Sequence, residues 1–154
     1  MDIEEQYDKI YRYCYFKMYN EQIAQDITQE TFLRFCKQGL NLGSNKELPY
    51  LYAIAKNLCI DHFRQRTVES LEEITEEVID DPTEEWISNL TLRMTVSKLP
   101  EDEQELIFLR YVNEISITAI CKITGLSRFS VYRRLSKSLN WLKEELLKEG
   151  FSSE

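Results

Sequence analysis

The chain has 154 residues, of which 43% are hydrophobic and 30% are charged, and its formal net charge at pH 7 is −8. Four glycines and three prolines are too few for a turn-rich β architecture, so the composition favours helices packed around small cores. The sequence has no apolar run of about 18 residues and no basic N-terminal segment with an apolar core, which predicts a soluble, cytoplasmic protein without membrane insertion.

The first 66 residues predict three amphipathic helices, because apolar side chains recur at every third or fourth position. We expect the helices at about residues 2–19, 21–37 and 46–66. Asp2 and Asn20 can cap the first two, since each side chain can accept a hydrogen bond from a free backbone N–H. The residues expected to face the core are Ile3, Tyr7, Ile10, Cys14 and Met18 in the first helix and Ala24, Ile27, Thr31 and Phe35 in the second.

The acidic excess is confined to one central stretch. Residues 67–92 carry nine acidic and no basic side chains, whereas residues 1–66 carry nine of each and residues 93–154 carry nine acidic and ten basic ones. Repulsion between the carboxylates predicts an extended, mobile linker at residues 67–82. The fold class that we predict is therefore all-α, with two small helical domains at residues 1–66 and 83–154 joined by this acidic linker.

The second domain is expected to begin with two helices. The first runs from Thr83 to about Ser97, with Trp86, Leu90 and Met94 inward. The second starts at the Leu-Pro pair of residues 99–100, because proline suits a first helical turn and the acids that follow suit the positive end of a helix. This helix should end near residue 113.

Residues 115–143 predict a helix-turn-helix, in which the second helix enters the DNA major groove. Gly125 suits a tight turn with positive φ, and Ser127 can cap the second helix. This stretch contains six Lys or Arg residues and no Asp or Glu, although the whole chain is acidic. An ordinary helical hairpin with a solvated basic face is the alternative. The inward residues are Ile117, Ile120, Ile123, Val131, Leu135, Leu139 and Leu142.

The cysteines and the single histidine do not predict a metal site or a bound cofactor. Cys14, Cys36, Cys59 and Cys121 are widely spaced, and His62 has no other candidate ligand near it in sequence except Cys59. We expect small buried thiols on apolar helix faces and neither a disulfide scaffold nor a metal centre.

Four segments together resemble motifs of the bacterial RNA polymerase sigma factors of the small, two-domain extracytoplasmic-function type. They are QDITQETFLRF (residues 25–35), LYAIAKNLCIDHFRQR (51–66), LPEDEQELIFLRY (99–111) and ICKITGLSRFSVYRRL (120–135). Each motif alone is weak, but four in this order are highly specific. The departures from the family pattern are Tyr50 for Trp, Gln104 for Arg, and Ala119 and Cys121 in the first helix of the helix-turn-helix.

The resemblance implies that the chain has no active site and acts through partners. Residues 1–66 would be a region 2-like domain that docks on core polymerase and captures the −10 element, and residues 83–154 a region 4-like domain that reads the −35 element. The implied partners are core RNA polymerase, through its β′ coiled coil and β flap, promoter DNA and an anti-sigma factor. The polymerase-binding residues would be Asp26, Gln29 and Glu30, whose alternative interpretation is a solvated helix face.

By the same resemblance, the third helix and the loop after it capture the −10 element as a single strand. Lys56 and Arg64 can hold phosphates, and Asn57 can read a base edge, as can Gln65. Tyr50 is a candidate stacking partner, as is Tyr52, although the latter lies on the apolar stripe. The full −10 set is Lys56, Asn57, Asp61, Arg64, Gln65 and Arg66.

The second helix of the helix-turn-helix would read the −35 element. Arg133 and Lys137 are one turn apart and can both reach a major groove, whereas Arg134 and Tyr132 are candidates for phosphate contacts. Whether Phe129 is exposed or packs under the helix is left open. The full −35 set is Arg128, Ser130, Tyr132, Arg133, Arg134, Ser136 and Lys137.

Two other functional classes compete with this interpretation. A stand-alone helix-turn-helix regulator would bind DNA without polymerase, but it leaves the N-terminal motifs unexplained. An enzyme is disfavoured, because the lone His62 offers no base–nucleophile arrangement and the sequence has no phosphate-binding glycine loop.

Overall fold

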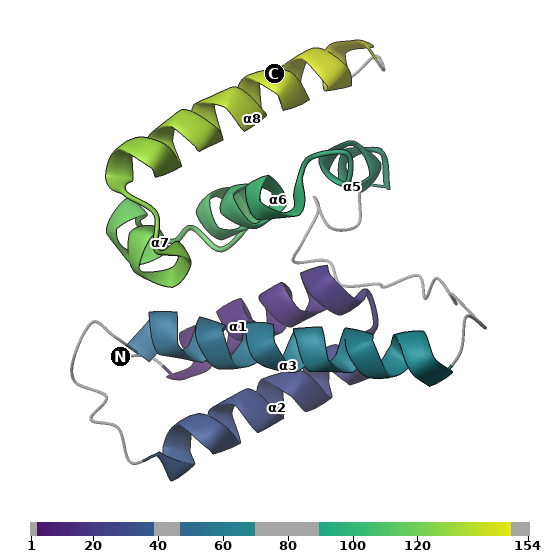
Figure 1. Ribbon diagram of the computed structural model, residues 1–154, viewed down its shortest axis with the longest axis vertical. Coiled ribbons are helices and arrows are strands. Elements are labelled where there is room, and N and C mark those ends of the chain that lie inside the picture. The colour runs from purple at the N-terminus through teal and green to yellow at the C-terminus, as the bar shows by residue number, and fades with distance from the viewer. Residues whose placement is uncertain (1–2, 39–46, 70–89, 149–154) are drawn as a thin grey trace. The chain divides into compact units, whose positions relative to one another are not determined.

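The computed structural model describes residues 3–38, 47–69 and 90–148, in which the helical elements follow one another without any strand. The chain divides into two compact units, Met1–Ile79 and Asp80–Glu154. The elements are α1 (Ile3–Met18), α2 (Glu21–Lys37), α3 (Glu47–Glu69), α5 (Leu90–Val96), α6 (Glu101–Ile107), a π-helical turn (Phe108–Val112), α7 (Ile117–Thr124) and α8 (Arg128–Lys148), as Figure 1 shows.

Most of the predicted linker lies outside the described residues. Residues 67–69 belong to α3, which ends three residues later than we predicted, and residues 70–82 are not described. The predicted helix from Thr83 is described only as α5, so its first half, with Trp86, also lies outside the described part. The predicted domain boundaries stay a prediction.

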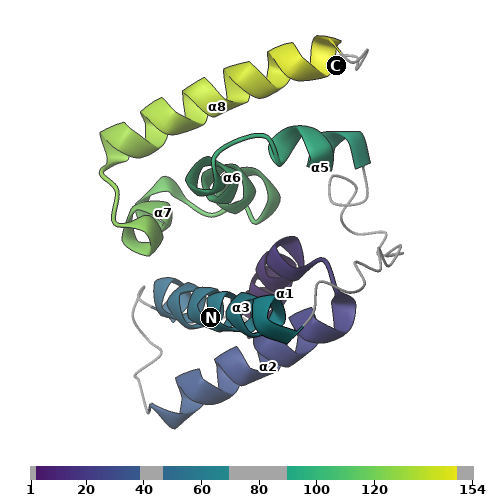
Figure 2. The ribbon, with the colours of Figure 1, turned by 45° about the vertical axis from the view of Figure 1, so that its right-hand side comes forward.

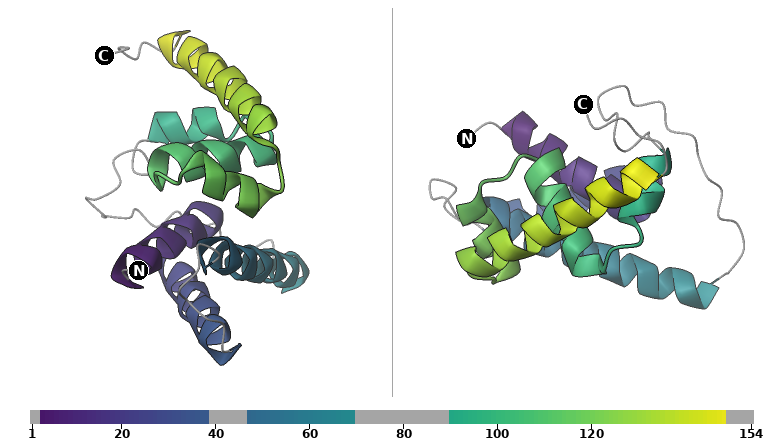
Figure 3. Two further views of the ribbon diagram at one scale, coloured as in Figure 1. Left: turned by 90° about the vertical axis from the view of Figure 1, so that its left-hand side faces the viewer. Right: turned by 90° about the horizontal axis from the view of Figure 1, so that it is seen from above.

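In the first unit, α1, α2 and α3 each pack against the other two (Figures 1 and 3). The predicted cap of α2 is confirmed, since the Oδ1 of Asn20 accepts a hydrogen bond from the Ile23 N–H at 3.0 Å. All four residues of the predicted inward face of α2 are buried. Its two threonines at positions 28 and 31 donate to backbone carbonyls four residues earlier, which satisfies their hydroxyls inside the core. The core of this unit includes Ile10, Tyr13, Cys14, Phe16, Ala24, Ile27, Phe35, Leu51, Tyr52, Ala55 and Cys59.

Two predictions for the start of α1 have different outcomes. Ile3 was expected to face the core but is 63% exposed, because it sits in the first turn of the helix, at its very end. Asp2, the predicted cap, lies outside the described residues.

In the second unit, α8 spans one side of α5, α6 and α7 (Figure 2). The Oγ of Ser138, which is buried, donates to the Oε2 of Glu103 at 3.0 Å and so ties the middle of α8 to α6. The core includes Leu106, Ile107, Phe108, Leu109, Ile117, Ile120, Val131, Leu135 and Leu142. Met94 was predicted to face inward, and this is wrong, since it is 58% exposed on the short helix α5.

The turn between α5 and α6 differs from the prediction in one detail. Pro100 lies at the N-cap position, with φ −55° and ψ 148°, rather than inside the first turn. Gln104, which replaces the family's usual Arg, donates its Nε2 to the Leu99 carbonyl at 2.8 Å. The Gln104 side-chain amide therefore stabilises the turn between α5 and α6.

The helix that starts at α6 ends at Asn113, as predicted, but widens first into the π-helical turn. The Asn113 N–H donates to the Phe108 carbonyl five residues earlier, at 3.1 Å, which is the bond that defines this widening. Glu114 then adopts a φ of 53°, in the left-handed region, and the chain turns into α7.

The helix-turn-helix has the predicted corner. Gly125 adopts a φ of 79°, in the left-handed region that glycine occupies without steric cost. Ser127 accepts a hydrogen bond from the Ser130 N–H at 3.1 Å, which is the predicted cap of α8. Ser116 caps α7 in the same way through the Ala119 N–H, at 3.2 Å.

The prediction of buried thiols holds for only half of the cysteines. Cys14 and Cys59 are buried, but Cys36 is exposed and Cys121 is half-buried. Within the described ranges, no group of three or more His, Cys, Asp or Glu side chains is placed to hold a metal ion. None of the described helices has the length and apolar character needed to cross a membrane.

Candidate functional site

The predicted polymerase-binding residues form one surface of α2, which we call the α2 acidic surface: Asp26, Gln29 and Glu30. These positions are i, i+3 and i+4, so the three side chains share one side of the helix. Asp26 and Gln29 are exposed and Glu30 is partly exposed, whereas the opposite side of α2 packs into the core. The structure therefore brings the predicted residues together.

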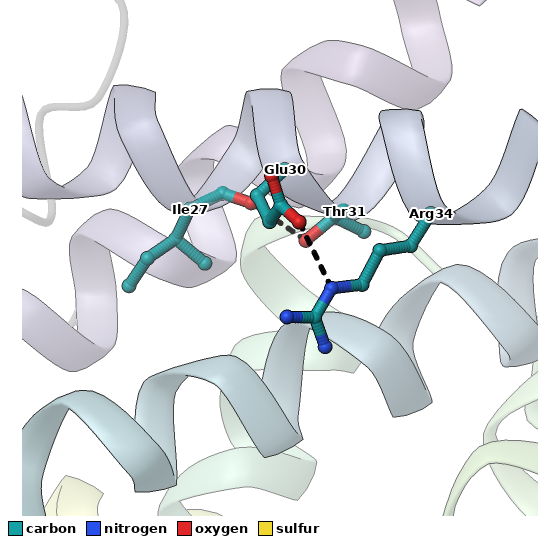
Figure 4. Close-up of polar contacts among 4 residues, drawn as sticks. All are labelled: Ile27, Glu30, Thr31 and Arg34. Carbon is teal, nitrogen blue, oxygen red and sulfur yellow. Dashed lines mark hydrogen bonds and ion pairs between the residues drawn. The ribbon is translucent and has the colours of Figure 1, made fainter. Parts of the chain in front are cut away.

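Both carboxylates of this surface have a partner on their own helix. The Gln22 Nε2 donates to Asp26 Oδ1 at 3.1 Å. The Arg34 Nε lies 3.0 Å from Glu30 Oε1, and Figure 4 shows this pair beside the bond from Thr31 back to the Ile27 carbonyl. Sequence analysis did not identify these partners.

The ion pair between Glu30 and Arg34 is weak, because its side chains are 44% and 52% exposed. Exposed pairs four residues apart in a helix contribute only about 0.3–0.5 kcal/mol. An arginine of a binding partner can therefore replace Arg34 at little cost in free energy.

The predicted −10 residues line the exposed side of α3. Lys56, Asn57, Asp61, Arg64 and Gln65 are all exposed. Arg66 lies within α3, but its side chain is outside the described part of the structure. In the described part of the chain, Asp61 does not pair with Arg64, although they lie three residues apart.

Of the two tyrosines suggested as stacking partners, Tyr52 is excluded. It is buried, and its ring meets that of Tyr13 edge-on, with centroids 5.2 Å apart. Tyr50 is half-buried, tilts against Phe35 at 5.9 Å and donates its hydroxyl to Gln38. Both rings thus help to hold α3 in place.

Two apolar side chains on the exposed side of α3 were missed by the sequence analysis. Ile60 and Phe63 are 39% and 43% exposed, and they lie between Asn57 and Arg64 in the sequence. Aromatic rings beside cations and amides are the usual platform for unpaired bases. The available signal was that both fall outside the apolar stripe of α3.

The predicted −35 residues lie on α8 and differ in exposure. Arg128, Tyr132, Arg133, Ser136 and Lys137 are exposed, and we call these five the α8 basic surface. Ser130 and Arg134 are half-buried and therefore less exposed than the other five. The Arg134 Nε lies 3.3 Å from the Ser130 Oγ. This contact with a side chain one turn earlier orients the Arg134 guanidinium along the surface of α8.

The start of α8 is fixed to α7 by side chains as well as by its cap. Arg128 donates its guanidinium to the hydroxyl of Thr118 on α7. Val131, one turn into α8, is completely buried and its N–H bonds to the Ser127 carbonyl at 2.9 Å. The backbone of the first turn of α8 is therefore fixed against α7, and its exposed side chains project from this fixed turn.

Phe129 is exposed, which settles the question that the sequence left open. Its side chain is 77% exposed, the highest value among the large hydrophobic residues of the described chain. This exposed fraction is too large for a ring that packs under the helix.

Comparison with known families matches both units. Residues 3–68 match Sigma-70 region 2, and residues 89–142 match Sigma-70 region 4. The first match contains α1, α2 and nearly all of α3, and the second contains α5 through most of α8.

Two curated relatives agree with these matches. The chain is 33% identical over 134 residues to the ECF RNA polymerase sigma factor BldN of Streptomyces coelicolor, which covers 77% of this chain and 48% of that protein. The chain thus spans about half the length of this relative. It is 29% identical over 156 residues to the ECF RNA polymerase sigma factor SigW of Bacillus subtilis, which covers 90% of this chain and 83% of that one.

A solved structure has the same fold. The sigma factor RpoE of Bartonella quintana, crystallised with the anti-sigma factor NepR, aligns with a TM-score of 0.68 and 24% identity. The alignment covers 95% of this chain and 94% of that one, so the likeness extends over both units.

Proposed function

The chain belongs to the sigma-70 family of RNA polymerase sigma factors, in its extracytoplasmic-function group, and on this premise we propose that it binds core polymerase and directs promoter-specific transcription initiation. The observation that carries the proposal is that both DNA-reading regions of the family occur in one chain, in the family's order. A stand-alone helix-turn-helix regulator would leave α1, α2 and α3 without a role. Like the rest of its family, the chain would act in the cytoplasm, where the chromosome lies.

The α2 acidic surface is our candidate for docking on the β′ coiled coil of polymerase. Carboxylates at Asp26 and Glu30, with the amide of Gln29 between them, suit arginines of a partner helix, because charge-assisted hydrogen bonds are strong and directional. The weak ion pair with Arg34 supports this role, since Glu30 can exchange one guanidinium for another.

The exposed side of α3 is our candidate for the −10 element. Lys56 and Arg64 would hold phosphates, Asn57 and Gln65 would read base edges, and Phe63 would stack on an unpaired base. The exposure of all five side chains supports the proposal.

The α8 basic surface is our candidate for the −35 element in duplex form. Arg133 and Lys137 lie one turn apart on the exposed side, where both can reach the edge of a guanine in a major groove. The second unit would also contact the β flap, which would set its distance from the −10 element.

We also propose an anti-sigma factor as a partner. The similar factor from Bartonella quintana was crystallised with one, and the α2, α3 and α8 surfaces are the ones that an inhibitor would have to cover. Occlusion of the α2 acidic surface alone would suffice to prevent assembly with polymerase.

The proposal is tested with the full chain and core polymerase. We expect tagged full chain to retain core polymerase, and the assembled enzyme to give a run-off transcript from a promoter enriched from a randomised duplex pool. Core polymerase without the chain is the control and should give no such transcript. Binding of duplex DNA by the chain without retention of polymerase would contradict the proposal and favour a stand-alone regulator.

A further inference from the structure

The exposed Phe129 is not explained by any of the contacts described above. A phenyl ring that is 77% exposed gains little from the fold of the free protein, because most of its apolar surface stays in water. It stands at the second position of α8, where the cap and the Arg128 bond to Thr118 hold the backbone.

The surroundings of Phe129 identify the chemistry of what covers it. Arg133 and Ser136 lie four and seven residues further along α8, so both project from the same side as Phe129. No Asp or Glu occurs in α8 before position 144. An apolar ring bordered by cations and hydroxyls, without carboxylates, suits a polyanion that also exposes apolar groups.

Duplex DNA has one such group in the major groove, the C5-methyl of thymine. The N-terminal residues of a recognition helix are the ones that contact base edges, and Phe129 is among them. We therefore propose that Phe129 is a specificity-determining residue that recognises a thymine methyl group in the −35 element. The inference rests on the proposed function, because it requires α8 to enter the major groove.

The experiment removes the methyl group and leaves the base pair intact. A −35 element is first enriched from randomised duplexes with core polymerase that carries the full chain. Each thymine in the element is then replaced in turn by deoxyuridine, and the affinity of the assembled enzyme is measured by fluorescence anisotropy. We expect one thymine, or two adjacent ones, at which the replacement weakens binding about three- to five-fold, as expected for one buried methyl group.

Variants assign this effect to Phe129. Phe129→Ala should abolish the difference between thymine and deoxyuridine, and Phe129→Leu, which keeps an apolar side chain, should retain a preference for thymine. Leu147→Ala is the matched control, since Leu147 is 55% exposed on the same helix but about 27 Å further along it. It should keep the full difference.

Three results would overturn the inference while the proposed function stands. In the first, the enriched element lacks thymine or is insensitive to the removal of every methyl group. In the second, Phe129→Ala keeps the difference in affinity between thymine and deoxyuridine. In the third, Phe129→Ala loses binding to core polymerase instead of the preference for thymine. The last result would place Phe129 against protein. If no −35 element can be enriched at all, the proposed function itself is contradicted, and the inference with it.

Discussion

Asp26 and Glu30 on α2 differ from Arg133 and Lys137 on α8 in whether other side chains hold them. On α2, Asp26 and Glu30 are each bonded to a side chain one turn away. On α8, Arg133 and Lys137 make no hydrogen bond or ion pair with any other residue that the structure describes. The difference would suit the two targets proposed above, because a folded protein offers its charges at fixed points, whereas duplex DNA offers base edges that vary with the sequence between two rows of phosphates.

The largest effect should come from reversing the α2 acidic surface. Asp26→Lys combined with Glu30→Lys places cations against the cations expected on polymerase, and like charges at an interface cost several kcal/mol. We expect the affinity for core polymerase to fall by at least about 100-fold, or ~3 kcal/mol, in a competition assay. Circular dichroism should show unchanged helicity, since both residues lie outside the core.

A matched variant separates this local effect from a change in net charge. Asp8→Lys with Glu144→Lys alters two exposed carboxylates by the same total charge, on α1 and α8. Its affinity for polymerase should stay close to that of the wild type. An equal loss in both double variants would contradict docking through α2.

Removal of single cations from α8 should have the next largest effect. Arg133→Ala and Lys137→Ala should each weaken binding to the −35 element by ~1–3 kcal/mol if the residue contacts a base. The measurement is anisotropy of the assembled enzyme on a panel of −35 elements with single-base changes. A base contact changes the preference at one or two positions, whereas a uniform loss would assign the residue to a phosphate.

The orientation of the α8 basic surface also depends on the turn at Gly125 between α7 and α8. A substitution at Gly125 should have a smaller effect, on stability. Gly125→Ala places a Cβ on a residue in the left-handed conformation, which costs ~1 kcal/mol. Apart from Gly125 itself and its two chain neighbours, no atom lies within 4 Å of the added Cβ to cause a clash. We expect the free energy of unfolding of the second unit to fall by about this amount. Gly125→Asn should lose less, because Asn tolerates this conformation better.

The readout must report on the second unit alone. Both tryptophans of the chain, at positions 86 and 141, fall in the second unit, so urea unfolding is followed by tryptophan fluorescence. A loss well above 2 kcal/mol would mean that the corner is more tightly packed than the open space around Gly125 indicates.

The elements could be predicted because their signals are local. Asn20, Gly125 and Ser127 act through the backbone within four residues, so the sequence alone locates the helix ends that they set. The exposure of Met94 could not be predicted, because it depends on how much of α5 the neighbouring helices cover. The sequence offered no signal for the π-helical turn. A period of 3.6 residues gives the direction of a side chain, but not whether another helix lies there.

The same distinction applies to the candidate surfaces. Exposure of the α2, α3 and α8 sets follows from the apolar stripe on the other side of each helix. The apolar stripe does not indicate which exposed side chains bond to one another. The bonds from Arg34 to Glu30 and from Arg128 to Thr118 are therefore seen only in the structure. Tyr52 is the opposite case, since its place on the apolar stripe correctly favoured the core over a role in stacking.

The smallest predicted effect tests whether the pairing on α2 competes with a partner. Arg34→Gln removes the guanidinium that holds Glu30 at 3.0 Å while keeping a good helix-forming residue. Since an exposed pair of this kind contributes ~0.3–0.5 kcal/mol, freeing Glu30 should raise the affinity for core polymerase about two-fold. The gain should disappear at about 1 M salt, where the charges are screened over roughly 3 Å.

Lys148→Gln is the matched control for Arg34→Gln, because it removes an exposed ion pair with Glu145 on α8, at 3.2 Å, and should leave the affinity for polymerase unchanged. A fall in affinity with Arg34→Gln would mean that Arg34 itself contacts polymerase. The Glu30–Arg34 pair would then bind polymerase as a unit. In that case α2 would bind its target through a preformed ion pair, whereas α8 would use two cations, Arg133 and Lys137, that are unpaired among the described residues.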